Sequence, residues 1–324
     1  MPIITGRKEA LKEIENIIGK NVSMAVFCTA SHWNTEAILL AAKKFCDKYH
    51  ISSIPLAVAI TFNYPHMPQA QRVTHTRNAR LGFVSIMEHL RLLCNDKDSP
   101  YCNIKVLPHL DHADPKNDRW ALTEGSQYLA SVMFDAQLYP LNANIALTRE
   151  YVKNDGRNLL VEGIMEELTV ANAGRKSDGM GKGYLERAVE YIHSTGIDFL
   201  VADLGTEQQS VSSGAAQYLQ ERASGLTKAL GRKMLALHGT SCLNRGQMGT
   251  LSDDGVVRVN MWTKIAREAG KYAAWNLFKR AEAIFNNDFN ALESNRYLMD
   301  STEKASELML EILEVLNYKN FALK

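Results

Sequence analysis

Eight short apolar runs, spaced along most of the chain, constrain its fold more than any other feature. They carry few charges, as do strands of a parallel sheet that is covered on both faces. Longer segments between them place apolar residues at helical spacing, at 34–49, 78–94, 142–153, 182–194 and 213–230. Strands that alternate with helices predict an α/β protein. The apolar runs cover residues 22–27, 54–61, 103–110, 128–135, 158–164, 198–204, 233–239 and 256–260.

Eight strands, most of them followed by a helix, favour a (β/α)8 TIM barrel over an open doubly wound sheet. No G-x-G-x-x-G sequence follows the first run, which removes the usual dinucleotide-binding fingerprint. We expect residues 1–324 to form one domain, with the barrel at about 20–265 and additional C-terminal helices at about 266–324. These helices exceed what a barrel needs, so we expect them to cover it or to pair subunits.

Charge and cysteine content narrow the classes of partner. The 37 basic and 36 acidic residues give a net charge of +1, so nucleic acid is a poor partner. No run of about 18 apolar residues occurs, so we expect no membrane span and no membrane partner. The N-terminus lacks the apolar core of a signal peptide. Five scattered cysteines without a C-x-x-C pair indicate reduced thiols in the cytoplasm.

The carboxyl ends of the strands are where a TIM barrel places its active site. The third run ends in the sequence HLDHAD, which contains Asp111 and His112, and the seventh ends in LHGTS, which contains His238. Imidazoles from two strands, with a nearby carboxylate or amide, can hold a divalent metal and leave one position open. Asp111 can then move protons for a substrate bound beside it. His109 fits a role in the core, or behind the site, better than a role as ligand.

These sequences carry a family resemblance. HLDHAD resembles the H-x-D-H signature of class II (metal-dependent) ketose-bisphosphate aldolases. Five further segments are similar to motifs of that family, in the same order along the chain. The resemblance covers roughly residues 20–280 and implies a TIM barrel with helical additions. The five segments are SVMFDAQLYPLNANIALTREYV (131–152), VEGI (161–164), TGIDFLVADLGT (195–206), LALHGTS (235–241) and VRVNMWT (257–263).

The resemblance implies a divalent metal, zinc by preference, held in the family by three histidines. Two of them correspond to His112 and His238. The third falls at Gln208, whose amide oxygen is a poorer ligand for zinc than imidazole. The adjacent Glu207 would give a set of two histidines and one glutamate, and Glu162 is a further candidate ligand. Complete loss of the metal stays open as a third alternative.

The resemblance also implies roles in catalysis and substrate binding. Asp111 corresponds to the residue that handles a substrate proton. The family's catalytic base in G-G-x-E has no clear counterpart, and Glu166 or Glu167 would replace it. Trp262 stands where the family has a substrate-binding aspartate. The residues expected to bind substrate or phosphate are Gly205, Gly239, Ser241, Asn260 and Thr263.

We therefore expect a divergent class II aldolase, an aldehyde-lyase that cleaves a phosphorylated ketose or related sugar reversibly through a metal-stabilised enediolate. Gln209 stands where the family has the glycine that begins a phosphate-binding loop. Trp262 and this altered loop argue against fructose 1,6-bisphosphate and favour a monophosphate or a sugar acid. The resemblance also implies a homodimer or homotetramer. A sugar-phosphate isomerase or epimerase, or an inactive sugar-phosphate-binding homologue, are the alternatives. A Schiff-base aldolase needs a lysine at an inner strand end, and neither Lys105 nor Lys233 is well placed for that role.

Overall fold

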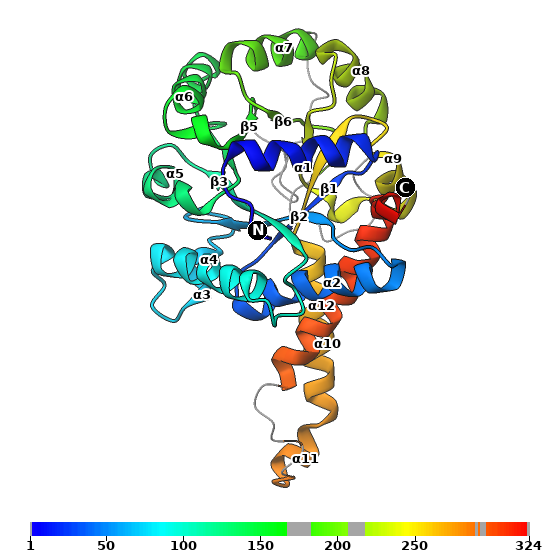
Figure 1. The fold of residues 1–324 in the computed structure, drawn as a ribbon. Helices are drawn as coiled ribbons and strands as arrows, with labels where there is room; N and C mark the ends of the chain where they lie inside the picture. Colours follow the sequence, from blue (N-terminus) through cyan, green and yellow to red (C-terminus); the bar gives the residue numbers. More distant parts are fainter. Residues whose placement is uncertain (1, 167–182, 207–217, 289–290, 292–295, 323–324) are drawn as a thin grey trace.

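The computed structural model describes residues 2–166, 183–206, 218–288, 291 and 296–322. Eight parallel strands form a closed barrel in chain order, which confirms the expected TIM barrel (Figure 1). The barrel closes where β8 pairs with β1, with Met24 opposite Arg258 and Phe27 opposite Met261. The strands are β1 (Met24–Cys28), β2 (Pro55–Thr61), β3 (Lys105–Ala113), β4 (Ser131–Phe134), β5 (Leu160–Ile164), β6 (Phe199–Val201), β7 (Leu235–Leu237) and β8 (Val256–Met261).

Helices surround this barrel, and nearly every strand residue is buried between them and the interior (Figure 1). Their starts follow local signals. Ser31 accepts a hydrogen bond from the Asn34 amide at the start of α2, and Asn78 does the same for Leu81 at the start of α4. The helices between strands are α2 (His32–Tyr49), α3 (Ala70–Val73), α4 (Ala79–Asn95), α5 (Arg119–Leu122), α6 (Leu141–Lys153), α7 (Tyr184–Thr195), α8 (Gln220–Leu230) and α9 (Arg245–Thr250), with short 3-10 turns η1 (Glu124–Tyr128), η2 (Asp155–Asn158) and η3 (Thr240–Cys242).

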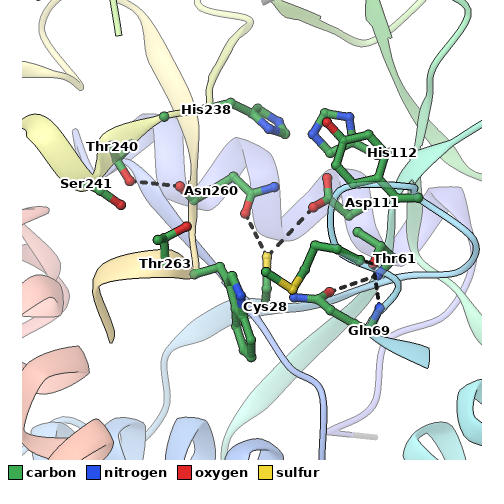
Figure 2. Close-up of a pocket in the computed structure, with 14 residues that line it drawn as sticks. Cys28, Thr61, Gln69, Asp111, His112, His238, Thr240, Ser241, Asn260 and Thr263 are labelled. Atoms are coloured by element: carbon green, nitrogen blue, oxygen red, sulfur yellow. Dashed lines mark hydrogen bonds between the residues drawn. The ribbon is translucent and has the colours of Figure 1, made fainter. Parts of the chain in front are cut away.

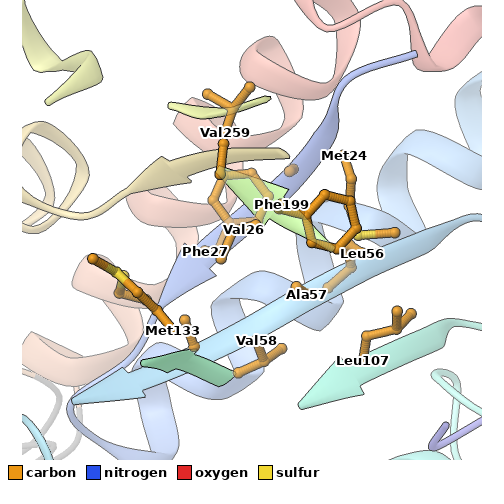
Figure 3. Packing of buried hydrophobic residues seen from close by; sticks show 14 of the residues in the cluster. Met24, Val26, Phe27, Leu56, Ala57, Val58, Leu107, Met133, Phe199 and Val259 are labelled. Atoms are coloured by element: carbon orange, nitrogen blue, oxygen red, sulfur yellow. The ribbon is translucent and has the colours of Figure 1, made fainter. Parts of the chain in front are cut away.

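The core lies inside the barrel and between the barrel and its helices. Figure 3 shows Met24, Leu56 and Phe199 among the apolar side chains gathered there. None of these three side chains is more than 3% exposed. Close packing of this kind fixes the direction of each strand, and therefore the direction in which the residue at its end points.

The N-terminal helix α1 (Arg7–Gly19) covers the amino end of the barrel. The Ile4 amide donates to the Val106 carbonyl near the start of β3. The Arg7 guanidinium forms two hydrogen bonds of 2.6 Å with Asp198, just before β6. Because α1 buries Ala10, Ile14 and Ile17 at this end, the opposite, carboxyl end is the one left for a ligand.

The chain after the barrel forms α10 (Thr263–Lys279), α11 (Ala281–Phe285), α12 (Arg296–Val315) and the turn η5 (Tyr318–Ala322). Helix α12 packs along α2, and its upper part lies against the barrel, while the lower parts of α10 and α12 project away from it (Figure 1). The buried Tyr318 hydroxyl donates to the Pro55 carbonyl and accepts from the Ala25 amide, at 2.9 Å each. Among the described residues, no helix combines the length and apolar character that crossing a membrane requires.

Candidate active site

A pocket of about 550 Å³ opens at the carboxyl ends of the strands. Figure 2 shows its side chains converging from several strand ends. Seven of the residues that line this pocket were expected from the sequence to take part in catalysis or binding. They are Asp111, His112, His238, Gly239, Ser241, Asn260 and Thr263. The remaining lining residues are Cys28, Thr61, Tyr64, Met67, Gln69, Thr240 and Trp262.

His112 occupies an unusual backbone conformation at the end of β3. Its φ of 48° lies in the left-handed region, which costs a residue with a Cβ about 1–2 kcal/mol. The pairing of β3 with β4 shifts register between Leu110 and Ala113, so His112 sits in this irregularity. Its Nδ1 lies 2.7 Å from Asp135 Oδ2, and Tyr64 stacks on the ring at 4.3 Å between centroids. Strain of this type clusters at functional sites, and here it aims the ring into the pocket.

The two imidazoles from β3 and the β7 end meet in the pocket. The ring centroids of His112 and His238 lie 5.0 Å apart with the planes nearly perpendicular. One nitrogen or oxygen of each of His112, His238 and Asp111 lies within 4.8 Å of the others. Within the described residues, His238 Nε2 and Asp111 Oδ1 are buried and have no hydrogen-bond partner. Two imidazole nitrogens and a carboxylate oxygen in one small volume suit a divalent ion such as zinc.

The charges of this cluster favour ionised forms in spite of burial. Burial alone would raise the pKa of Asp111, but the neighbouring His112, His238 and His109 outweigh it and hold the pKa below its usual value. Burial would likewise lower the pKa of His112, and Asp111 and Asp135 reverse this and raise it. Asp111 is therefore an ionised carboxylate on the pocket lining and can accept a proton.

A second buried cluster lies one layer deeper inside the barrel. Arg258 on β8 places Nε 2.6 Å from Glu162 Oε1 on β5 and donates from Nη1 to Ser131 Oγ on β4. His109 on β3 shares the same serine at 2.9 Å. Burial would raise the pKa of Glu162, yet Arg258 and His109 lower it to about 2. Burial is the largest influence on His109 and lowers its pKa to about 4.

The model of one protein family, described as fructose-bisphosphate aldolase class-II, matches residues 12–320. This chain belongs to that family. A Streptococcus pyogenes relative named fructose-bisphosphate aldolase is 29% identical over 176 residues, which are 53% of this chain and 58% of the relative. A Bacillus licheniformis relative named 6-phospho-5-dehydro-2-deoxy-D-gluconate aldolase is 27% identical over 214 residues, 63% of this chain and 66% of that protein. The chain thus spans little more than half the length of the first of these relatives.

Solved structures agree on the architecture. A fructose-bisphosphate aldolase from Campylobacter jejuni superposes with a TM-score of 0.74 at 16% identity, covering 98% of this chain and 96% of that one. A putative fructose-1,6-biphosphate aldolase from Coccidioides immitis gives a TM-score of 0.70 at 17% identity, covering 97% of each chain. At these identities the likeness shows the fold alone, and that fold is the TIM barrel of the class II aldolase family.

Several sequence-predicted residues of this family member lie away from the pocket or outside the described residues. Glu162 belongs to the deeper cluster, with Oε2 4.0 Å from His238 Nε2. Glu166 is largely exposed and pairs with Arg187 at 2.8 Å. The Gly205 amide donates to Asp203 Oδ1 at the end of β6, and Gly205 is not among the pocket-lining residues. The three remaining predictions, Glu167, Glu207 and Gln208, fall outside the described residues.

Lysines stay away from the pocket within the described part of this aldolase-family chain. Lys105 at the start of β3 pairs with Glu13 of α1, and Lys233 donates to Asn21, which lies just before β1. Both are therefore at the amino end of the barrel, opposite the pocket. This placement agrees with the sequence-based argument against Schiff-base chemistry.

Six pocket residues had no part in the expected site: Cys28, Thr61, Tyr64, Met67, Gln69 and Thr240. Three of them belong to the loop after β2. Gln69 fastens this loop, since its Oε1 accepts from the Thr61 backbone amide and its own backbone amide donates to Thr61 Oγ1. One sequence signal could have identified the loop residues. Segment 62–77 has the composition of a long loop after the second strand, and the loops that follow the strands of a TIM barrel build its active site. Cys28, as the last residue of β1, is covered by the same rule.

Proposed function

We propose that this protein is a class II aldolase that reversibly cleaves a carbon–carbon bond in a phosphorylated ketose or related sugar. The observation that carries the proposal is the convergence of His112, His238 and Asp111 in one pocket at the carboxyl mouth of a barrel. Membership of the class II family supports it, as do the names of the two relatives. The whole chain is the proposed active unit, with α12 packed on α2 and α10 packed on α12.

His112 and His238 are the proposed ligands of a divalent ion, zinc by preference, with Glu207, Gln208 or Glu162 as candidates for the third position. The buried atoms His238 Nε2 and Asp111 Oδ1, unpartnered in the described residues, make the cluster a good fit for a cation. Asp135 holds the Nδ1 side of His112, so that Nε2 is the nitrogen for the metal. When bound, the ion would supply a Lewis acid that polarises a substrate carbonyl.

The chain's own residues then move protons and hold the substrate. Asp111, ionised and buried beside the two imidazoles, accepts the proton of the hydroxyl that becomes the aldehyde, and returns it in the condensation direction. Glu166 or Glu167 is the proposed second base. Asn260 and Thr263 face the same space from β8 and the start of α10 (Figure 2).

The phosphate group is proposed to bind at the loop after β7. Gly239 has a φ of 70°, a conformation that glycine adopts without strain, and it leads into the turn η3. Its amide and the Ser241 hydroxyl lie on the pocket wall, where TIM barrels commonly hold phosphate. Gly205, after β6, is proposed to complete this phosphate site.

The apolar and aromatic part of the pocket lining favours a substrate with one phosphate. This part consists of Tyr64, Met67 and Trp262, and no lysine or arginine is among the described pocket residues. A second phosphate would need cationic partners that these three side chains do not supply. We therefore propose a monophosphate or a sugar acid as substrate. The Bacillus licheniformis relative is named for a 6-phospho sugar acid, whereas the Streptococcus pyogenes relative is named for a bisphosphate, so the choice rests on the pocket lining.

The deciding experiment follows product formation from a panel of phosphorylated ketoses and sugar acids by NMR, with and without a chelator. An aldolase gives two carbon fragments, chelator abolishes turnover, and a divalent metal restores it. His112→Ala should lose both metal and turnover, while the control His75→Ala, at an exposed position, should keep both. A single isomeric product, or turnover indifferent to the chelator, would contradict the proposal.

We also propose a homo-oligomer in the cytoplasm. Helices α10 and α11 expose a set of large apolar side chains on the part that projects from the barrel (Figure 1). Exposed apolar patches of this kind mark protein interfaces. Cys28, Cys46, Cys94 and Cys102 are free thiols, which fits a reducing compartment. Light scattering on wild type and Phe278→Ser would test the assembly. The exposed set is Tyr272, Trp275, Leu277, Phe278 and Phe285.

A further inference from the structure

A thiol at the end of β1 connects three of the strands that build the pocket. Cys28 is only 3% exposed, and its Sγ lies 2.9 Å from Asn260 Oδ1 on β8 and 3.8 Å from Asp111 Oδ2 on β3. Figure 2 shows both contacts, with the sulfur below the two side chains. Neither the expected ligands nor the expected substrate contacts include this residue.

The chemistry of the partners fixes the direction of the shorter contact. Burial and the nearby Asp111 raise the pKa of the Cys28 thiol well above its usual value, so the sulfur carries a proton. The side-chain oxygen of an asparagine can only accept. Cys28 therefore donates to Asn260 Oδ1, and the amide NH2 of Asn260 is turned toward Asp111 (Figure 2). Asn260 is thus a side-chain hydrogen-bond partner of Asp111.

Reversal of the Asn260 amide would undo this arrangement. Its oxygen would then face the Asp111 carboxylate, and two acceptors would meet without a proton between them. The backbone of Asn260 is already held, because Thr240 Oγ1 donates to its carbonyl at 2.9 Å. The side-chain amide of Asn260 can still adopt two orientations, with either its oxygen or its nitrogen toward Cys28. The Cys28 thiol favours the orientation in which the oxygen faces the sulfur.

We propose that Cys28 is a positioning residue: it holds Asn260 so that the amide donates toward Asp111 and keeps this carboxylate aimed into the pocket. The inference rests on the proposed function, in which Asp111 transfers a substrate proton. Cys28 acts through Asn260 and does not need to touch the reacting atoms. A hydroxyl in its place would donate the same hydrogen bond, whereas a methyl group would not.

The kinetic test compares Cys28→Ser with Cys28→Ala. One neutral hydrogen bond is at stake, so kcat of Cys28→Ala should fall about three- to tenfold while KM changes little. Cys28→Ser should stay near wild type. Cys46→Ala is the matched control, because Cys46 is a buried thiol on α2 away from the pocket. Wild-type kcat in Cys28→Ala, or equal losses in both Cys28 variants, would overturn the inference.

Infrared spectroscopy tests the hydrogen bond without any substrate. The S–H stretching band of Cys28 is identified by its loss in Cys28→Ser. In Asn260→Leu the band should move, because the thiol loses its acceptor at 2.9 Å, and circular dichroism checks that the variant is folded. A band that does not move overturns the assigned hydrogen bond. A wild-type protein without aldolase turnover overturns the proposed function instead, so the two failures are distinguishable.

Discussion

Two buried histidines on one strand have opposite electrostatic environments. His109 and His112 both lie on β3, and both are at most 5% exposed. Burial lowers the pKa of each, and for His109 it prevails, because Arg258 offsets much of the attraction of Glu162. For His112 the carboxylates of Asp111 and Asp135 prevail and raise the pKa.

The difference shows that the barrel has two buried polar clusters with separate roles: the deeper one stabilises the fold, and the one at the carboxyl end lines the pocket. The deeper cluster of Arg258, Glu162, His109 and Ser131 is closed and pairs an arginine with a glutamate at 2.6 Å. The upper cluster of Asp111, His112 and His238 opens on the pocket, and all three residues line it. Substitutions in the upper cluster should therefore change catalysis, and those in the deeper cluster should change stability.

The largest expected effect is on catalysis in the upper cluster. Asp111→Asn removes the proposed proton carrier and keeps its size, so kcat should fall about 10²–10⁴-fold, the range for a general acid–base group. The melting temperature should change little. Steady-state kinetics and thermal unfolding on the same preparation check this, with metal content measured beside them.

The matched control is Asp118→Asn, which changes a buried aspartate that does not line the pocket. If Asp111→Asn kept its activity, the upper cluster would lose its assigned chemistry. If it lost its metal together with its activity, Asp111 would be a ligand instead of a proton carrier.

The next effect is on stability in the deeper cluster. Arg258→Met leaves Glu162 charged and buried without its partner, so the free energy of unfolding should fall by about 3–5 kcal/mol. The double variant Arg258→Met, Glu162→Leu removes both charges and should recover much of that loss. Urea unfolding followed by circular dichroism measures all three proteins. A double variant less stable than Arg258→Met would mean that the pair itself stabilises the barrel.

The sequence was sufficient to predict the barrel because each strand is mostly apolar and buried on both faces. Strands that are buried on both faces appear as continuous apolar runs, without alternating polar residues. Every one of the eight apolar runs overlaps an observed strand. The convergence of Asp111, His112 and His238 was predictable for the same reason, since the carboxyl ends of parallel strands meet at one face. Strand order then follows from closure of the barrel.

Contacts that depend on backbone irregularities or on loop packing could not be read from the sequence. The left-handed φ of His112 comes from a register shift between β3 and β4, which no spacing reveals. The stacking of Tyr64 on His112 needs the path of the loop after β2. Arg258 looked like an ordinary charged residue within an apolar run, and only the position of Glu162 across the barrel explains its burial.

The smallest expected effect is the pH dependence that His109 gives to stability. Its pKa is about 4 in the folded chain and 6.5 as the ordinary value. Above pH 6.5 both states are neutral and stability is complete. As the pH falls from 6.5 to 4 the unfolded chain binds the proton first, so stability is lost, by up to about 3 kcal/mol.

His109→Gln cannot take up this proton, so its free energy of unfolding should fall less between pH 7 and pH 5 than that of wild type. Urea unfolding at the two pH values measures the difference. The control His75→Gln, at an exposed position, should keep the wild-type pH dependence. Equal slopes in His109→Gln and wild type would mean that His109 binds a proton as readily in the folded barrel as in the unfolded chain. The contrast between the two histidines of β3 would then fail, because the attraction of Glu162 would offset the effect of burial at His109.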